Sequence, residues 1–329
     1  MKRKLLYGIG TLFLLILLGY AYWHYEFLIH QKILNLQLSF RDKKESKLMN
    51  ANLDSIKLLP NLSDEEGAWY TKYHFIAHGG GGIEGKTYSN SLEAMNHSYE
   101  NGIRVFDIDM TFTSDSVLVC CHSWLNNFEQ DSLSMSESNS FVDRNGHLQH
   151  HTPPHLLDYF TFKSKKIYRC YTPMSSEDLL SFMVKYPDVY IAPDMKDDVV
   201  LSYQYLVDRA KEMKVDSVLN RIIANVYDYD VYDMIMRVYP FRITTARQHH
   251  VHPNNYYELA KFCINNNIHV VNLSSCYVSD EGAKLLMSKG VHVYVAVVDY
   301  ISDLEELKRN GFSGACTNWL KEIDWEIIK

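Results

Sequence analysis

Two histidines and three aspartates stand in this chain where acid–base and metal chemistry would need them. His78 ends the apolar run IAH and is followed by four glycines, while Asp107 and Asp109 share the stretch FDID. Residues two apart on a strand point to the same face, so these carboxylates would repel each other unless a cation lay between them. Hard divalent ions bind oxygen ligands of this kind. The pattern therefore predicts a Ca²⁺ or Mg²⁺ site close to a histidine.

The stretch IAPDMKD adds a third carboxylate and a fixed positive charge. Asp194 and Lys196 share a face by the same alternation, so Asp194 would complete the ligand set and Lys196 would face a bound phosphoryl group. His122 follows another short apolar run, and two histidines can divide the roles of general acid and general base near neutral pH. Glycines such as Gly79 and Gly80 let backbone N–H groups approach an anion closely.

Short β-rich runs alternate with amphipathic helical segments from about residue 70 onward, which is typical of a parallel sheet covered by helices. We expect strands at 73–77, 105–110, 117–121, 189–194, 222–226, 241–245, 269–273, 292–298 and 314–317. Only TFTSDS joins the second run to the third, which is too short for a parallel crossover. The third run should therefore form an antiparallel hairpin. Eight parallel strands remain, the number in a TIM (β/α)8 barrel, and an open doubly wound sheet is the alternative.

The hairpin predicts where the second histidine lies. A turn centred on Ser114–Asp115 places His122 opposite Asp107, within one residue. The active sites of TIM barrels lie at the C-terminal ends of the strands. A hairpin extending beyond that end would bring His122 to the predicted metal site.

The N-terminal segment predicts a membrane anchor. MKRK precedes the uncharged stretch from Leu5 to Trp23, whose length matches the about 20 residues of one membrane pass. The basic residues should stay cytoplasmic, so the rest of the chain would face the periplasm or the extracellular side of the cell membrane. A cleaved signal peptide is the alternative, although Tyr20, Tyr22 and Trp23 do not resemble the small residues of a cleavage site.

The expected organisation is therefore an anchor over residues 1–24, a stalk over 25–69 and a barrel domain over 70–329. The polar stretch 123–165 interrupts the alternation of strands and helices and predicts an inserted loop or small lobe. Its histidines have no regular ligand spacing and are interpreted as solvated loop residues: His147, His150, His151 and His155. A net charge of −7 gives no general attraction to nucleic acid, and no CxxC pair signals zinc or a redox motif.

These motifs resemble those of the glycerophosphodiester phosphodiesterase family, within the phospholipase-C-like phosphodiesterase barrels, over about residues 73–320. The family's His-Arg-Gly, Glu-Asn-Thr, Glu-x-Asp, His-Asp and Glu-x-Lys motifs are matched here by His78-Gly79-Gly80, Ser89-Asn90-Ser91, Asp107-Ile108-Asp109, His122-Ser123 and Asp194-Met195-Lys196. The stretches VHVYVAVVD and GFSGACTNW also resemble the family's closing strands.

The resemblance implies a metal-dependent hydrolase of small or lipid-derived phosphodiesters. It implies that His78 and His122 are the acid and base, that the three aspartates bind the metal, and that Asn90 and Lys196 position the phosphate. A neighbouring hydroxyl of the substrate would attack phosphorus first, and water would then open the cyclic phosphate.

The chain also departs from the family motifs. Gly79 replaces the motif arginine, Ser89 and Ser123 replace acids, and Asp107 and Asp194 are each one methylene shorter than glutamate. The Asp-x-Lys pattern also resembles sphingomyelinase D relatives, so a lyase that releases a cyclic phosphate is one alternative. A non-catalytic barrel that binds a cell-envelope partner is the other.

Overall fold

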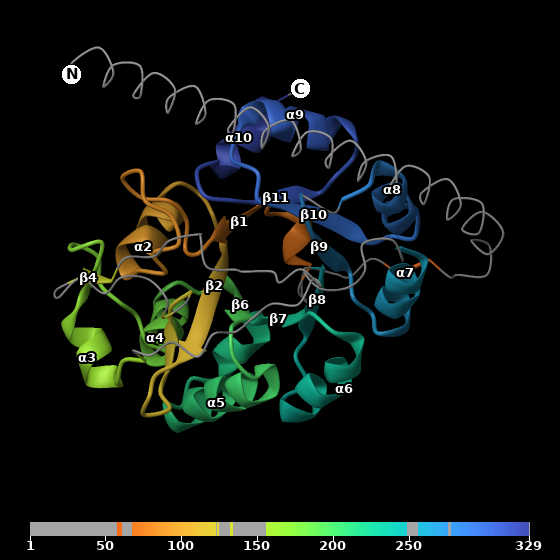
Figure 1. Cartoon of the computed structure of the whole chain (residues 1–329). Helices are drawn as coiled ribbons and strands as arrows, with labels where there is room; N and C mark the ends of the chain where they lie inside the picture. Colours follow the sequence, from red (N-terminus) through yellow and green to blue (C-terminus); the bar gives the residue numbers. More distant parts are fainter. Residues whose placement is uncertain are drawn as a thin grey trace, which may run out of the picture. The chain divides into compact units, whose positions relative to one another are not determined.

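A nine-stranded sheet forms the centre of the fold, and every strand except β3 runs parallel to its neighbours (Figure 1). The computed structural model describes residues 58–60, 68–122, 124, 132–133, 156–248, 256–275 and 278–328. The strands are β1 (Phe75–His78), β2 (Val105–Phe112), β3 (Leu118–Cys120), β6 (Tyr190–Met195), β7 (Ile223–Val226), β8 (Ile243–Gln248), β9 (Val270–Ser274), β10 (His292–Ala296) and β11 (Gly314–Thr317).

The parallel strands curl around a common interior (Figure 1). β1 pairs with β2 and with β11, and the ladders continue from β11 through β10, β9 and β8 to β7. β2 pairs with β6 on its other edge, and a bridge between Ile191 and Ile222 connects β6 to the start of β7. The strand order thus returns to its starting point, as expected for a TIM barrel.

Helices follow the strands in sequence and lie outside the curled sheet (Figure 1). They are α2 (Leu92–Glu100), α4 (Ser176–Lys185), α5 (Val199–Glu212), α6 (Tyr229–Val238), α7 (Tyr256–Asn265), α8 (Asp280–Ser288), α9 (Ile301–Arg309) and α10 (Glu322–Ile327), with a 3-10 helix η5 (Asp216–Arg221). Ser91 caps the start of α2 by accepting a hydrogen bond from the Ala94 N–H. The Asn-Gly pairs after α2 and α9 end these helices, with Gly102 and Gly311 at positive φ.

The hairpin of β2 and β3 has nearly the predicted register. Met110 faces Cys120, so facing positions sum to 230 rather than about 229. The Cys121 N–H then donates to the Asp109 carbonyl over 2.9 Å, which leaves His122 next to the carboxylates of β2. The predicted antiparallel hairpin is confirmed.

The core at the N-terminal end of the strands includes residues that the sequence places in the stalk. Trp69, in the 3-10 helix η3 (Trp69–Thr71), is 1 % exposed and belongs to the cluster that contains Ile76 and Tyr294. The Leu59 N–H also donates to the Lys289 carbonyl over 2.9 Å. The packed unit therefore begins before residue 70, and the segment 57–329 forms one unit.

The described part of the insertion packs on the hairpin. The strands β4 (Ser132–Leu133) and β5 (Lys166–Ile167) pair, and α3 (Tyr159–Ser164) lies between them in sequence. A small second core joins Trp124 and Phe162 to Val119, with Cys121, Ile167 and Tyr171. The four histidines of the insertion lie outside the described residues.

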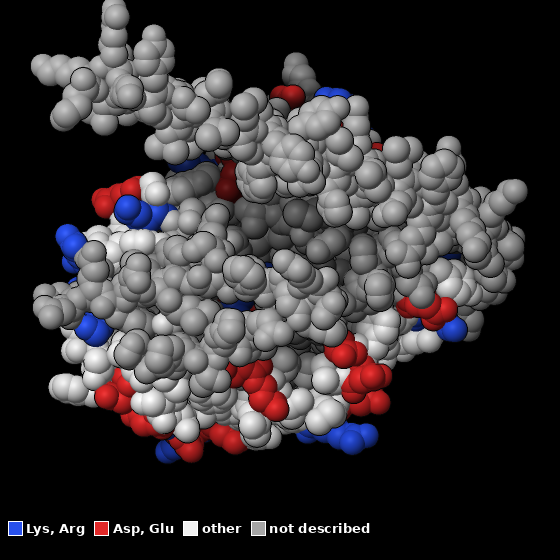
Figure 2. Space-filling view, viewed as in Figure 1, with Lys and Arg blue, Asp and Glu red and all other residues white. Residues whose placement is uncertain are grey.

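The predicted anchor from Leu5 to Trp23 also lies outside the described residues. In the part of the chain that the structure describes, no helix has both the length and the apolar character for a membrane pass. On the face shown in Figure 2, Lys and Arg side chains are scattered among Asp and Glu side chains. The prediction that nucleic acid is not a partner stays a prediction.

Candidate active site

Strand register brings the predicted site residues together at the C-terminal ends of the first strands. His78 is the last residue of β1 and pairs with Asp107 of β2. Asp109, two residues further along β2, pairs with Asp194 of β6. All four residues are buried, because their side chains point into the interior of the curled sheet.

His78 is held in a defined orientation by two residues from the last strands. Its Nδ1 atom lies 3.2 Å from Oδ1 of Asn318, which follows β11. The Asn318 amide is itself fixed, because its Nδ2 and its backbone N–H donate to Asp299 over 2.8 and 2.7 Å. A carboxylate only accepts hydrogen bonds, so the amide oxygen must face His78. The His78 Nδ1 atom therefore carries the proton, and Nε2 remains available for the reaction.

His122 lies at the same end of the barrel. The ring of Tyr88 contacts both histidines, with centroids 4.4 Å from the His78 ring and 5.1 Å from the His122 ring. Burial lowers the pKa of His122 below 6.5, and the nearby Asp109 carboxylate opposes that shift. His122 is therefore mainly neutral at pH 7, the state in which it can accept a proton.

Asp107 is bound by an arginine from the far side of the barrel. Nη1 and Nη2 of Arg247 donate to the two carboxylate oxygens of Asp107, each over 2.9 Å. β2 and β8 are not neighbours in the sheet, so the Arg247 side chain spans the interior. Nη2 also lies 3.2 Å from Oδ2 of Asp194, and the Arg247 side chain is only 4 % exposed.

The other two carboxylates share a lysine. Lys196 Nζ lies 2.8 Å from Asp109 Oδ1 and 2.8 Å from Asp194 Oδ2. Asn90 binds Asp109 twice, donating from Nδ2 to Oδ2 over 2.8 Å and accepting from the Asp109 N–H over 3.0 Å. The Tyr227 hydroxyl, just after β7, donates to Asp194 Oδ1 over 2.6 Å.

These contacts set the charges of the group. Burial by itself would raise the pKa of Asp194, but Arg247 and Lys196 outweigh it and hold that pKa well below its usual range. Asp109 behaves in the same way, with Lys196 as the dominant opposing charge. Burial also works to lower the pKa of Lys196, yet the two aspartates raise it. Asp109, Asp194 and Lys196 are therefore ionised together at neutral pH. At Asp107, by contrast, burial outweighs Arg247 and raises the pKa of the carboxyl.

As arranged, the three aspartates do not fit a divalent metal ion. Each of their carboxylate oxygens already has a nitrogen or hydroxyl donor from Arg247, Lys196, Asn90 or Tyr227. Among the residues that the structure describes, no group of three or more His, Cys, Asp and Glu side chains is placed to hold a metal ion. The predicted set of free oxygen ligands at Asp107, Asp109 and Asp194 is thus not present in this arrangement.

The glycines after His78 have a clear packing role. Gly79 has φ +55°, and a Cβ atom there would lie 2.9 Å from the Tyr88 Cα atom. A Cβ atom on Gly82 would overlap the Trp319 ring. The Gly80 N–H donates to the Asp107 carbonyl over 3.2 Å, so it is already engaged. The predicted phosphate contact of Gly79 and Gly80 stays a prediction.

Sequence reasoning missed four polar residues of this site: Tyr227, Arg247, Asp299 and Asn318. Tyr227, Asp299 and Asn318 follow strands β7, β10 and β11, and Arg247 is the next-to-last residue of β8. The rule that located His78 and Asp194 at strand ends would have found them if it had been applied to the last five parallel strands.

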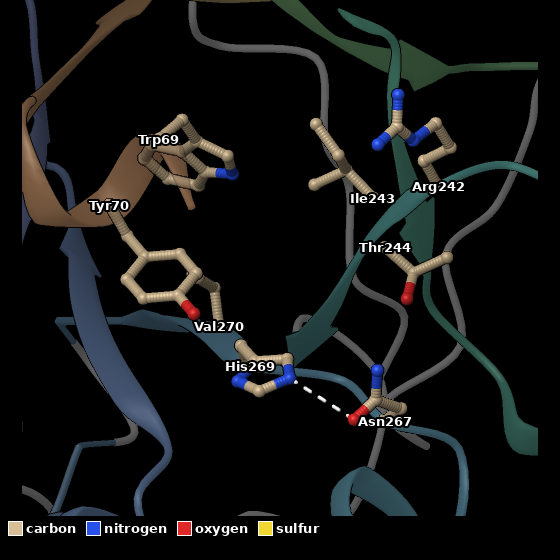
Figure 3. A pocket seen from close by; sticks show the side chains of 8 residues that line it. All are labelled: Trp69, Tyr70, Arg242, Ile243, Thr244, Asn267, His269 and Val270. Atoms are coloured by element: carbon tan, nitrogen blue, oxygen red, sulfur yellow. Dashed lines mark hydrogen bonds between the residues drawn. The ribbon is translucent and has the colours of Figure 1, made fainter. Parts of the chain in front are cut away.

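A small pocket lies at the opposite end of the barrel (Figure 3). It is lined in part by Trp69, Tyr70 and His269, and His269 Nε2 lies 3.2 Å from Asn267 Oδ1. Two other lining residues are the first residues of β8 and β9, so the pocket opens at the N-terminal ends of the strands. It is separate from the candidate active site.

Comparison with known sequences decides the family. The sequence model of the glycerophosphoryl diester phosphodiesterase family matches residues 81–319, which is most of the chain. The chain belongs to this family. It is accordingly a phosphoric diester hydrolase with a TIM-barrel fold, and the predicted family and enzyme class are confirmed. Members generally use a divalent metal.

Solved structures support the fold. A phosphodiesterase from Oleispira antarctica, in complex with the product sn-glycerol-3-phosphate, is 12 % identical with a TM-score of 0.56, covering 79 % of this chain and 97 % of that one. A glycerophosphodiester phosphodiesterase from Parabacteroides distasonis is 17 % identical with a TM-score of 0.54, covering 78 % and 96 %. A candidate enzyme of the same type from Galdieria sulphuraria is 15 % identical with a TM-score of 0.58, covering 75 % and 94 %. No curated protein sequence matches this chain.

Proposed function

We propose that this chain hydrolyses a glycerophosphodiester, or a closely related small phosphodiester, with His78 and His122 as its acid–base pair. The observation that carries this proposal is the hydrogen-bonded chain from Asp299 through Asn318 to His78. These hydrogen bonds fix the proton of the His78 ring on Nδ1 and leave Nε2 for proton transfer. Such an arrangement suits a histidine that exchanges protons with a substrate better than one that only fills a core.

The two histidines differ in their surroundings, which suggests how the roles divide. Because burial lowers the pKa of His122, His122 suits the general base that takes a proton from the attacking hydroxyl or water. His78, in its protonated form, would give the Nε2 proton to the oxygen of the leaving alcohol. Water and a phosphodiester would thus yield a phosphomonoester and an alcohol.

Positive charge at the site supports a phosphorylated substrate. The Lys196 ammonium group lies 2.8 Å from both Asp109 and Asp194, and the side chain as a whole is 25 % exposed. An ammonium group next to the reacting phosphorus would stabilise the negative charge that develops on the phosphoryl oxygens. This proposal needs no step through Ca²⁺ or Mg²⁺.

The substrate class rests on the family and on one relative. Family members act on small phosphodiesters, and the Oleispira antarctica phosphodiesterase binds sn-glycerol-3-phosphate as its product. We therefore propose a glycerol phosphate moiety on one side of the cleaved ester. A lipid-derived phosphodiester is compatible with the same chemistry.

The test is product analysis by phosphorus NMR with the full-length protein. Glycerophosphocholine, glycerophosphoethanolamine, glycerophosphoglycerol and a lysophospholipid would be incubated with the wild type and with His122→Ala. The proposal expects glycerol phosphate as the final product from at least one substrate, and a spectrum unchanged over time with the variant. A cyclic phosphate that accumulates without being opened would identify a lyase instead.

A further inference from the structure

We propose that Arg247 takes the place of the divalent metal ion of the family, so that this enzyme binds and cleaves its phosphodiester with built-in cations. This inference rests on the proposed function and deepens it. It concerns the same site and names what neutralises the phosphate there.

Arg247 makes an ion pair of well-defined geometry with the carboxylates. The planar guanidinium fork matches both oxygens of Asp107 at 2.9 Å, and Nη2 also lies 3.2 Å from Asp194. One cation thus bridges an acid of β2 and an acid of β6, the two strands that carry the predicted metal ligands. A bidentate arginine pair that is almost fully buried is a strong and specific contact. A metal ion on the same two carboxylates would have to displace it.

The remaining carboxylate oxygens of Asp109 and Asp194 also have donors. Ca²⁺ takes about six to eight oxygen ligands, and Mg²⁺ takes about six in near-octahedral geometry. Here Lys196 holds one oxygen of Asp109 and one of Asp194, Asn90 holds the other oxygen of Asp109, and Tyr227 holds the other oxygen of Asp194. Two side-chain cations, Arg247 and Lys196, therefore already contact all three carboxyl groups.

Several departures from the family motifs fit a guanidinium group, which is larger than a divalent metal ion. Aspartate replaces glutamate at 107 and 194, which withdraws each carboxylate by one methylene and makes room for a guanidinium group. Gly79 removes the motif arginine, and the close approach of Tyr88 leaves no space for a side chain there. Arg247 returns an arginine to the site from the opposite strand.

Arg247 also has one donor that no described residue uses. Arg247 Nε is buried and has no hydrogen-bond partner among the described residues. A buried donor without a partner is costly, so a phosphate oxygen or a water molecule would be a favourable partner for it. The Tyr227 ring, 6.0 Å from the guanidinium carbon, helps to keep the group in place.

The experiment combines turnover with a metal titration that does not depend on turnover. Full-length wild type would be treated with EDTA and desalted over chelating resin, and its residual metal would be measured by mass spectrometry. Turnover would then be measured with EDTA, Ca²⁺ or Mg²⁺. Binding of Ca²⁺, Mg²⁺ and Mn²⁺ would be followed separately by calorimetry and by thermal unfolding, for the wild type, Arg247→Ala, Arg247→Lys and Asp107→Asn.

The inference expects metal-free wild type to keep its turnover within about twofold, because no step draws on the ion. It also expects no saturable binding of divalent ions by the wild type at this site. Arg247→Ala leaves Asp107 and Asp194 without their shared partner, so a divalent ion should raise its melting temperature and leave that of the wild type unchanged. Arg247→Lys keeps the charge, so its melting temperature should not respond to the ion.

Two results would overturn the inference. One is loss of turnover in EDTA with recovery in Ca²⁺ or Mg²⁺, which would leave the proposed function standing. The other is saturable binding of one divalent ion by the wild type that Asp107→Asn abolishes. If no phosphodiester is cleaved under any condition, the proposed function fails, and the titration of the wild type still decides the role of Arg247. If Arg247→Ala does not fold, the titration of the wild type with divalent ions still decides the role of Arg247.

Discussion

Asp299 acts on His78 through an intervening amide, which makes it a positioning residue with a measurable signature. In Asp299→Asn the new amide can donate as well as accept, so the Asn318 amide can turn and present its NH₂ group to His78 Nδ1. An NH₂ group facing Nδ1 would favour the His78 tautomer with its proton on Nε2, which is the wrong one for the proposed reaction. We expect kcat to fall by about tenfold or more, part of the ~10²–10⁴ that general acid–base catalysis contributes, with KM little changed.

A double-variant comparison separates this role from simple loss of stability. In a His78→Ala background the Asn318 amide has no ring to orient, so Asp299→Asn should cost little further activity. If Asp299→Asn lowered kcat by the same factor in both backgrounds, its effect would not run through His78. Thermal unfolding of both variants would show whether the fold is retained.

The pH dependence of kcat/KM tests the role of His122 as base. Because burial lowers the pKa of His122 below 6.5, its neutral form persists into mildly acidic solution. Activity should therefore be retained as the pH falls to 6.5 and should decline only below that value, as His122 gains a proton. An acidic limb above pH 6.5 would contradict this assignment. The measurement is a pH profile under substrate-limited conditions.

At the residue scale, the sequence located the site residues on the first parallel strands and missed those on the later ones. His78, Asp107 and Asp194 follow from alternation and strand ends, and the structure places all three in the same interior. Arg247 could not be paired with Asp107 from the sequence. Their contact crosses the barrel between strands that are not neighbours, and alternation within a strand carries no information about such a distance.

At the scale of elements, the segment after β1 depends on the close approach of two backbone stretches. Gly79 and Gly85 both have positive φ, but a Cβ atom on Gly79 meets the Tyr88 backbone whereas one on Gly85 meets nothing within 4 Å. Gly85→Ala is therefore a matched control for backbone strain. We expect Gly85→Ala to lower the free energy of unfolding by about 1–2 kcal/mol through its φ alone.

Gly79→Ala should lower the free energy of unfolding by the same strain and by about 1–3 kcal/mol more, because the new methyl group overpacks against Tyr88. Urea unfolding of the two variants and the wild type measures the difference. Equal losses in the two variants would show that the contact with Tyr88 carries no cost. A loss of activity confined to Gly79→Ala would fit the position of Tyr88 against both histidine rings.

The elements themselves were largely predictable. Each of the nine expected strands overlaps an observed one, and 314–317 coincides with β11. The reason is local, because apolar runs, helix signals and the short link TFTSDS together leave few arrangements. The burial of Trp69 was not predictable in this way, because it depends on the packing of η3 against residues distant in sequence.

At the scale of the whole molecule, the proposal that residues 5–23 anchor the chain in the cell membrane gives a direct prediction. Full-length protein should sediment with membranes and resist extraction by high salt and by alkaline carbonate, because its attachment is apolar. A variant that lacks residues 1–24 should appear in the soluble fraction of the cell lysate. Sedimentation of this variant with membranes, or release of the full-length chain by salt, would contradict the anchor.

The central claim is hydrolysis of a phosphodiester by His78 and His122 acting together. The most direct measurement is kcat on the best glycerophosphodiester for the wild type, His78→Ala, His122→Ala and the double variant, with circular dichroism to confirm folding. The account predicts that each single variant loses about 10²–10⁴ in kcat and that the double variant loses little more, because the pair acts as one unit. Folded single variants that keep turnover near that of the wild type would contradict the account.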